Sequence, residues 1–161
     1  MFIAQIYPAR DVARVAALRR LEILDTPPTV EFDQIAWSAK TLFETSAAFV
    51  SFVDEDRQWF KARAGADMVE TDRSASFCSH CIAYRNPLWI EDARDDPRVF
   101  DNPFVTGAPF IRFYAGAPIR DVDGWLLGTV CVIDTQPRAH DLRLETGLIA
   151  LAGMASALLG G

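Results

Sequence analysis

Residues 76–82, with the sequence SFCSHCI, contain two of the chain's three cysteines and one of its two histidines. Thiolate and imidazole groups are the preferred ligands of zinc, and a Cys-x-x-Cys pair can close into a disulfide. A single thiol in such a stretch can also hold a chromophore. The spacing therefore raises the question of whether this segment binds a metal, acts as a redox couple, carries a chromophore or only packs a helix.

A metal site is the least supported of these interpretations. If the segment is helical, at about 100° per residue Cys78 and Cys81 lie about 60° apart, while His80 lies about 160° from Cys78. A structural zinc needs four converging ligands. The remaining candidates, Cys131 and His140, fall in an apolar strand and at the start of the last helix. We therefore predict no metal site.

Two interpretations of the cysteine pair remain open. A thiolate is stabilised near the beginning of a helix, so that Cys78 and Cys81 could form a redox couple. Alternatively, both fill the core together with their apolar neighbours, because free cysteine behaves as a small buried hydrophobe. The second interpretation is favoured. An odd number of cysteines without a disulfide framework is typical of a reducing compartment, which predicts a cytoplasmic protein.

Composition predicts one globular domain over residues 1–161, since half of the residues are hydrophobic and a quarter are charged. The net charge of −6 argues against binding to nucleic acid or to an anionic membrane surface. Residues 1–6 lack the basic start of a signal peptide. The uncharged tail from residue 146 is shorter than the ~17 residues of a short membrane span, so no membrane contact is expected.

Apolar periodicity and turn signals give the expected elements. Helices are predicted at 11–24, 29–44, 76–84 and 141–160, and strands at 47–53, 58–63, 88–90, 111–119 and 125–134. The acidic turn 54–56 and the Asp-Gly turn 121–124 close two antiparallel hairpins. The fold class is therefore α+β, an α/β/α sandwich with a central antiparallel sheet of five to six strands and helices on both faces.

The connection between residues 91 and 109 is longer than usual, which is typical of functional loops. Aromatic side chains gather around it, as they do around an apolar ligand cavity. The expected ligand-binding residues are Phe77, Cys78, His80, Trp89, Asp92, Phe110, Arg112 and Tyr114. The chain has no phosphate loop, nucleophile elbow or kinase signature, so we expect no catalytic residue and a protein that is not an enzyme.

In the last predicted helix, apolar residues recur at spacings of four and three. The series is Leu144, Leu148, Leu151, Ala155 and Leu158. This is the seam of a coiled coil, but it is also the face with which a single helix covers a sheet. Dimerisation and packing within one chain remain open.

Several segments together carry a family resemblance. They are 21–28 (LEILDTPP), 49–61 (FVSFVDEDRQWFK), 76–80 (SFCSH), 101–103 (DNP), 112–118 (RFYAGAP) and 127–134 (LGTVCVID). In this order they resemble the GAF domains of bacterial sensor proteins, over residues 18–159. The resemblance implies an α/β/α sandwich, a small-molecule cavity under the long connection, a homodimer through the terminal helices, and a downstream histidine kinase or diguanylate cyclase domain.

Specialised relatives refine this expectation. Bilin-binding members place a histidine directly after the linking cysteine, whereas Ser79 follows Cys78 here, so no bilin cofactor is expected. Free methionine sulfoxide reductases resemble the chain near Cys78, but the long connection lacks their second cysteine. The family motif usually has alanine where Cys81 stands. The expected function is sensing of an unknown small molecule. The alternatives are a thiol-redox enzyme or sensor using Cys78 and Cys81, and a dimerisation scaffold without ligand.

Overall fold

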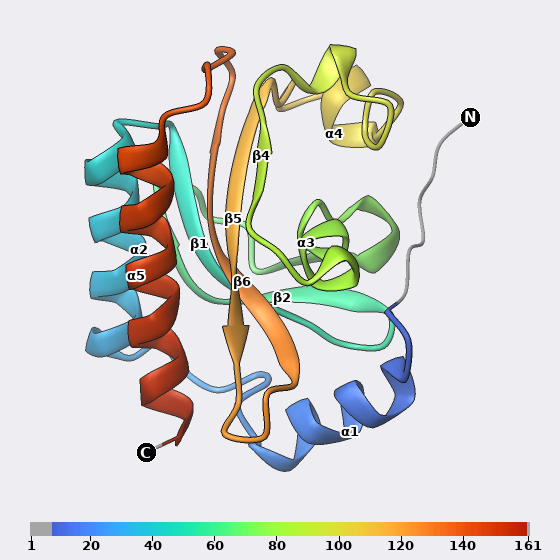
Figure 1. Cartoon of the computed structure of the whole chain (residues 1–161), viewed down its shortest axis with the longest axis vertical. Coiled ribbons are helices and arrows are strands. Elements are labelled where there is room, and N and C mark those ends of the chain that lie inside the picture. Colours follow the sequence, from blue (N-terminus) through green and yellow to red (C-terminus); the bar gives the residue numbers. More distant parts are fainter. Residues whose placement is uncertain (1–7, 161) are drawn as a thin grey trace.

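The computed structural model describes residues 8–160. They form three layers, with a central β-sheet between two layers of helices (Figure 1). The central sheet is antiparallel throughout, with six strands in the order β3-β2-β1-β6-β5-β4. Its strands are β1 (Ala47–Val53), β2 (Arg57–Ala64), β3 (Glu70–Asp72), β4 (Leu88–Ile90), β5 (Phe113–Arg120) and β6 (Leu126–Asp134). Residues 1–7, where the sequence lacks the features of a signal peptide, and residue 161 lie outside the described residues.

Helices cover both faces of the sheet, as predicted. On one face α2 (Val30–Phe43) and α5 (Leu142–Gly160) lie side by side (Figure 1). On the other face lie α3 (Cys78–Tyr84), α4 (Pro103–Thr106) and the connection that carries α4. α1 (Asp11–Arg20) runs beneath the end of the sheet. The α+β sandwich with helices on both faces is therefore confirmed.

The alternation of side chains along the strands divides the core into two. In β1, Ala48, Val50 and Phe52 face α2 and α5, whereas Phe49 and Val53 face α3. Successive side chains of a strand point to opposite faces, and a strand buried on both faces reads as an unbroken apolar run. The sequence AAFVSFV of β1 is such an apolar run, with one polar residue in it. The exception, Ser51, lies on the α3 side.

Three elements differ from the sequence prediction. The first helix ends at Arg20 and not at Leu24, because Glu22 has a left-handed φ of 53°. Leu21 and Leu24 still pack against the core, and so mimic a continued helical face. Strand β3 is not among the predicted strands, since the short polar sequence of an edge strand shows no apolar alternation. The long connection contains the short helix α4 and a 3₁₀ turn at Ala93–Asp95.

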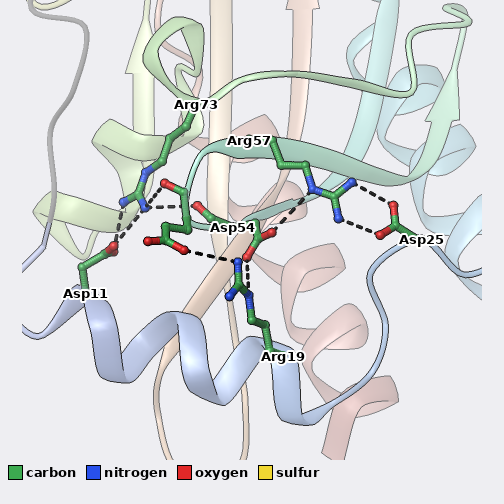
Figure 2. Close-up of polar contacts among 7 residues, drawn as sticks. Asp11, Arg19, Asp25, Asp54, Arg57 and Arg73 are labelled. Atoms are coloured by element: carbon green, nitrogen blue, oxygen red, sulfur yellow. Dashed lines mark hydrogen bonds and ion pairs between the residues drawn. The ribbon is translucent and has the colours of Figure 1, made fainter.

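A network of ion pairs fastens α1 to the sheet (Figure 2). The carboxylate of Asp11 accepts hydrogen bonds from Arg73 at 2.9 Å and from Arg14 at 2.9 Å. Arg73 belongs to the 3₁₀ turn Arg73–Ala75 immediately before α3, and it also donates to the backbone carbonyl of Asp54. Arg19 donates to the carboxylate of Asp54 at 3.0 Å. The N-terminal helix is thus tied to the segment that leads into α3.

α5 is the one helix among residues 8–160 that is long and apolar enough to cross a membrane by length and composition. In this structure it packs on β5, β6 and α2. Leu148 and Ala155 are buried, and Leu144 and Leu151 are packed against the same core. Most of the predicted seam therefore contacts the chain's own sheet, while Leu158 remains exposed.

Candidate functional site

The sulfur of Cys78 lies at the centre of a buried polar cluster. Three hydroxyl groups are within hydrogen-bonding distance of it: Thr129 Oγ1 at 2.9 Å, Tyr114 OH at 3.2 Å and Ser51 Oγ at 3.3 Å. The sulfur of Cys131 lies 3.9 Å from the sulfur of Cys78. All five side chains are almost fully buried. The cluster is therefore an isolated set of hydroxyl and thiol groups inside an apolar core.

Three neighbouring strands bring these groups together. β6 lies between β1 and β5 in the sheet, and Ser51 of β1 pairs directly with Thr129 of β6. Because side chains alternate along a strand, Thr129 and Cys131 point to the same face, which is the face covered by α3. Cys78 is the first residue of α3, so it meets them from above the sheet. The site depends on strand order as much as on local sequence.

Gly116 gives Tyr114 the room to reach the cluster. Both residues lie on the α3 side of β5, two positions apart, and a Cβ at Gly116 would approach the Tyr114 hydroxyl to 2.3 Å. The phenol ring therefore lies over the glycine, along its own strand. Any larger side chain at position 116 would displace the hydroxyl from Cys78.

These contacts change the acidity of the two thiols in opposite directions. Burial alone would raise the pKa of Cys78, but hydrogen bonds from Cys131, Ser51, Thr129 and Tyr114 outweigh it and lower that pKa to about 7. The hydrogen bond with Cys78, together with burial, raises the pKa of Cys131. Since each hydroxyl has one proton, Ser51 donates either to Cys78 or to Thr129, from which it is 3.0 Å away. At neutral pH Cys78 is thus the thiol of the cluster that ionises.

Cys81 behaves differently from Cys78. Its sulfur lies 3.1 Å from the carbonyl oxygen of Asn86 and 3.8 Å from that of Gly116, so its S–H has acceptors and no donors around it. Burial raises its pKa. Cys81 therefore stays a protonated core residue, as the favoured interpretation of the sequence expected.

A cavity of about 50 Å³ adjoins the cluster. Its lining includes Cys78, Cys131 and Tyr114 together with Phe104 and Pro109 of the long connection. A buried water needs ~10–15 Å³ of such space, whereas sites for drug-sized ligands usually measure 300–1,000 Å³. In the conformation described, the cavity fits a few atoms, and a larger ligand would require the connection to move.

The predicted ligand-binding residues do not all meet at this cavity. Phe77, Cys78 and Tyr114 line it. The other five, which lie outside its lining, are His80, Trp89, Asp92, Phe110 and Arg112. The alternation of side chains along β4 explains part of this separation. Trp89 points to the face of the sheet that is opposite the cavity, where it packs on both Phe43 and Phe113.

The remaining four residues have structural surroundings of their own. His80 is buried beside Tyr84, and its pKa is lowered by burial and by Arg98, which keeps the ring neutral. Asp92 accepts hydrogen bonds from the backbone and the side chain of Arg94. Arg112 donates to the carbonyl oxygen of Val105 and thereby fastens the long connection. Phe110 is exposed.

Sequence reasoning missed Ser51, Thr129 and Cys131 as members of the site. Among residues 8–160 no group of three or more His, Cys, Asp or Glu side chains could hold a metal ion. The cluster's chemistry is instead that of a thiolate held by neutral donors. Such a group can act as a nucleophile, a hydrogen-bond acceptor or a reductant.

The chain matches one family model and is similar to a curated protein. The GAF domain family model matches residues 5–158. A cyclic di-GMP phosphodiesterase of Pseudomonas aeruginosa is 42% identical over 132 residues, which are 82% of this chain and 22% of that protein. The chain thus spans about a fifth of the length of this curated relative.

Solved structures with the same fold include two of different function. The GAF domain of PixJ from Thermosynechococcus elongatus has a TM-score of 0.68 at 16% identity, covering 91% of this chain and 88% of that one. A type II free methionine-R-sulfoxide reductase from Thermoplasma acidophilum has a TM-score of 0.63 at 16% identity, covering 80% and 92%. At these identities the likeness establishes the fold alone.

The prediction that the chain is not an enzyme is contradicted by these comparisons. The curated relative is named as a phosphodiesterase, and a chain of the same fold is named as a reductase. The prediction treated the lack of familiar catalytic motifs as decisive. A fold supports catalysis through sites that no short motif encodes, so this lack was not a sufficient argument.

Proposed function

Because the chain belongs to the GAF domain family, we propose that it is the sensory domain of a longer bacterial protein that controls the level of cyclic di-GMP. The observation that carries this proposal is the match of the GAF family over residues 5–158, supported by the similarity to a cyclic di-GMP phosphodiesterase. The resemblance led us to expect a histidine kinase or a diguanylate cyclase as the output domain. We favour a phosphodiesterase, since the curated relative at 42% identity is named as a cyclic di-GMP phosphodiesterase. The protein acts in the cytoplasm, where cyclic di-GMP is made and degraded.

The sensed molecule is a small compound that enters beside Cys78, under the 91–110 connection. Tyr114 and Thr71 supply polar atoms to a lining that is otherwise mainly apolar. Binding there would favour one position of the connection and of the turn before α3. A ligand shifts such an equilibrium only by its difference in affinity for the two states.

The terminal helices pass this change on to neighbouring domains and to a second copy of the chain. Arg73, at the start of the turn before α3, is bound to Asp11 of α1, so that a shift of the turn moves α1. The outer face of α5 exposes Ile149, Met154 and Leu158. This apolar face supports a homodimer through α5.

Native mass spectrometry of the chain purified from its source organism tests ligand binding. The expected result is a retained compound that is released on unfolding. The variant Ala75→Leu adds three carbon atoms at the lining of the cavity and should lose the compound. Ala66→Leu is the matched control, because Ala66 is half-buried nearby but outside the lining, and it should keep the compound.

The output is tested with the full-length protein that carries this chain. Its rate of cyclic di-GMP hydrolysis should change with the compound in the parent and in Ala66→Leu, but not in Ala75→Leu. A hydrolysis rate that is indifferent to the compound in all three proteins would contradict the proposed relay. Retention of the compound by Ala75→Leu would contradict the assignment of the cavity.

A further inference from the structure

We propose that Cys78 and Cys131 form a thiol pair that hydroperoxides oxidise to a disulfide. This inference names a class of molecule to which the cavity responds, and only its relay to α1 rests on the proposed sensory function. The pair differs from the Cys78 and Cys81 couple suggested by sequence spacing. It joins α3 to the middle of β6, two elements that are remote in the chain.

The sulfurs of Cys78 and Cys131 are close enough for a small movement to join them. They lie 3.9 Å apart, in van der Waals contact, with both side chains 2% exposed. A disulfide bond is about 2.05 Å long, so oxidation requires the sulfurs to approach by about 2 Å. A change of side-chain rotamer with a small shift of α3 supplies such a movement. Cys81 directs its thiol to backbone carbonyl oxygens instead.

Hydroxyl groups surround the sulfur of Cys78. Thr129, Tyr114 and Ser51 come from three different strands and all direct hydroxyl groups at one sulfur. Hydroxyl donors stabilise the thiolate, which is the form that attacks a peroxide. An ordinary buried cysteine has no such donors, and apolar surroundings would keep it protonated. The cluster thus supplies the hydrogen-bond donors that a thiolate at Cys78 requires.

The cavity beside the two sulfurs has room for a small oxidant. Both sulfurs belong to its lining, and its volume of about 50 Å³ fits the two oxygen atoms of a hydroperoxide group. A substrate of the size of methionine sulfoxide does not fit in the same conformation. The cavity would therefore select the oxidant by size as well as by reactivity.

The reaction balances without any further reagent. The Cys78 thiolate attacks the terminal oxygen of the hydroperoxide, the S–O bond forms and the O–O bond breaks. The alcohol, or water in the case of hydrogen peroxide, leaves with the proton that the Cys78 thiol had given up. The sulfur of Cys131 then attacks the sulfenic sulfur of Cys78 and gives up its own proton. The S–O bond breaks, water leaves and the disulfide is complete, with two electrons passed from the thiols to the peroxide.

The disulfide would pull the beginning of α3 towards the sheet. The segment before Cys78 is held by specific contacts: Ser76 donates to the side chain of Gln58, and Arg73 donates to Asp11 of α1. A shift of α3 therefore disturbs the same turn that a bound ligand would disturb. Oxidation and ligand binding use one relay.

Intact-mass analysis tests the oxidation itself. The reduced chain is treated with hydrogen peroxide at pH 7, then unfolded in the presence of iodoacetamide. The expected product carries one alkyl group, on Cys81, and peptide mapping finds Cys78 linked to Cys131. The untreated chain should carry three alkyl groups. A link between Cys78 and Cys81, or three free thiols after treatment, would overturn the proposal.

Variants separate the steps. Cys131→Ser should stop at the sulfenic acid of Cys78, which dimedone traps, and Cys131→Ala replaces it if the serine variant does not fold. Cys81→Ser is the matched control and should form the disulfide at the parental rate. Thr129→Val keeps the shape but removes one donor, so it should raise the pKa of Cys78 and slow the oxidation at pH 7. An unchanged oxidation rate in Thr129→Val would show that the donors do not activate the thiol.

This experiment is independent of the output domain. Disulfide formation without any change in cyclic di-GMP hydrolysis would leave the thiol pair established and refute the relay. A retained ligand in a chain whose thiols do not oxidise would support the sensory domain and refute the thiol pair.

Discussion

The substitution Asp11→Asn tests whether the ion-pair network holds α1 on the sheet (Figure 2). The Asp11 carboxylate neutralises two guanidinium groups, those of Arg14 and Arg73, whose side chains are only 2% and 3% exposed. Asparagine keeps the size and one acceptor oxygen but removes the negative charge. Both buried arginines would then lose the charge of this carboxylate.

The expected cost follows from this burial. Removing one partner of a buried ion pair typically destabilises a protein by about 3–5 kcal/mol, because a buried charge is left uncompensated. Here Arg14 still donates to the carbonyl of Leu126 and Arg73 to that of Asp54, which places the effect near the lower limit, about 3 kcal/mol. For a domain of this size that corresponds to a fall in Tm of roughly 6–12 °C.

Urea unfolding followed by tryptophan fluorescence measures this loss. The matched control is Asp25→Asn, which removes the same charge from the same network at a carboxylate that is 64% exposed. Position 25 has a left-handed φ of 63°, which asparagine tolerates well, so a loss of roughly 0–1 kcal/mol is expected there. If the two variants lose equal stability, the reasoning from burial is wrong.

The network also predicts a pH dependence. Burial alone would raise the pKa of Asp11, but hydrogen bonds from Arg73 and Arg14 outweigh it, so the pKa is lowered from its ordinary value of 3.8. A lowered pKa stabilises the fold above the unfolded-state value, and this contribution is lost as the pH falls towards the folded-state value. The difference in stability between the wild type and Asp11→Asn should therefore narrow below about pH 4.

Five further substitutions test the packing and the proposed dimer. Leu148→Ala should lower the free energy of unfolding by about 3 kcal/mol in urea titration, whereas Leu142→Ala, at an exposed position of the same helix, should change it by less than about 1 kcal/mol. Gly128→Ala should abolish folding as judged by circular dichroism, because its Cβ would lie 1.8 Å from the carbonyl oxygen of Ser51, while Gly153→Ala has open space and should stabilise α5 by about 0.5–1 kcal/mol. Met154→Glu should shift the chain from dimer to monomer in analytical ultracentrifugation, and an unchanged sedimentation coefficient would contradict a dimer through α5.

The overall fold could be predicted from the sequence because local patterns encode it. The apolar run of β1, the helical spacing in α2 and the Asp-Gly turn before Trp125 are each sufficient within a window of a few residues. The end of α1 could not be found in this way, since Leu21 and Leu24 continue its apolar pattern while Glu22 breaks its backbone. Strand β3 exists only because β2 offers it a free edge.

The site could be predicted only in part, for a physical reason. Cys78 was recognised by its residue type and by its neighbours in the chain, but Cys131 was interpreted as an apolar strand residue. Ser51 and Thr129 gave no signal of their own. Their meeting depends on β6 lying between β1 and β5, which is a property of tertiary pairing and not of any local segment. Sequence spacing suggested Cys81 as the partner instead, because nearness in the chain was the only measure it offered.

The turn between β5 and β6 touches both terminal helices. Arg14 of α1 donates to the carbonyl of Leu126 at the beginning of β6. The backbone N–H of Arg120, at the end of β5, donates to Ser156 of α5. In a longer polypeptide, domains attached before and after this one would thus be coupled in parallel through a single hairpin, and not in sequence through the whole sheet.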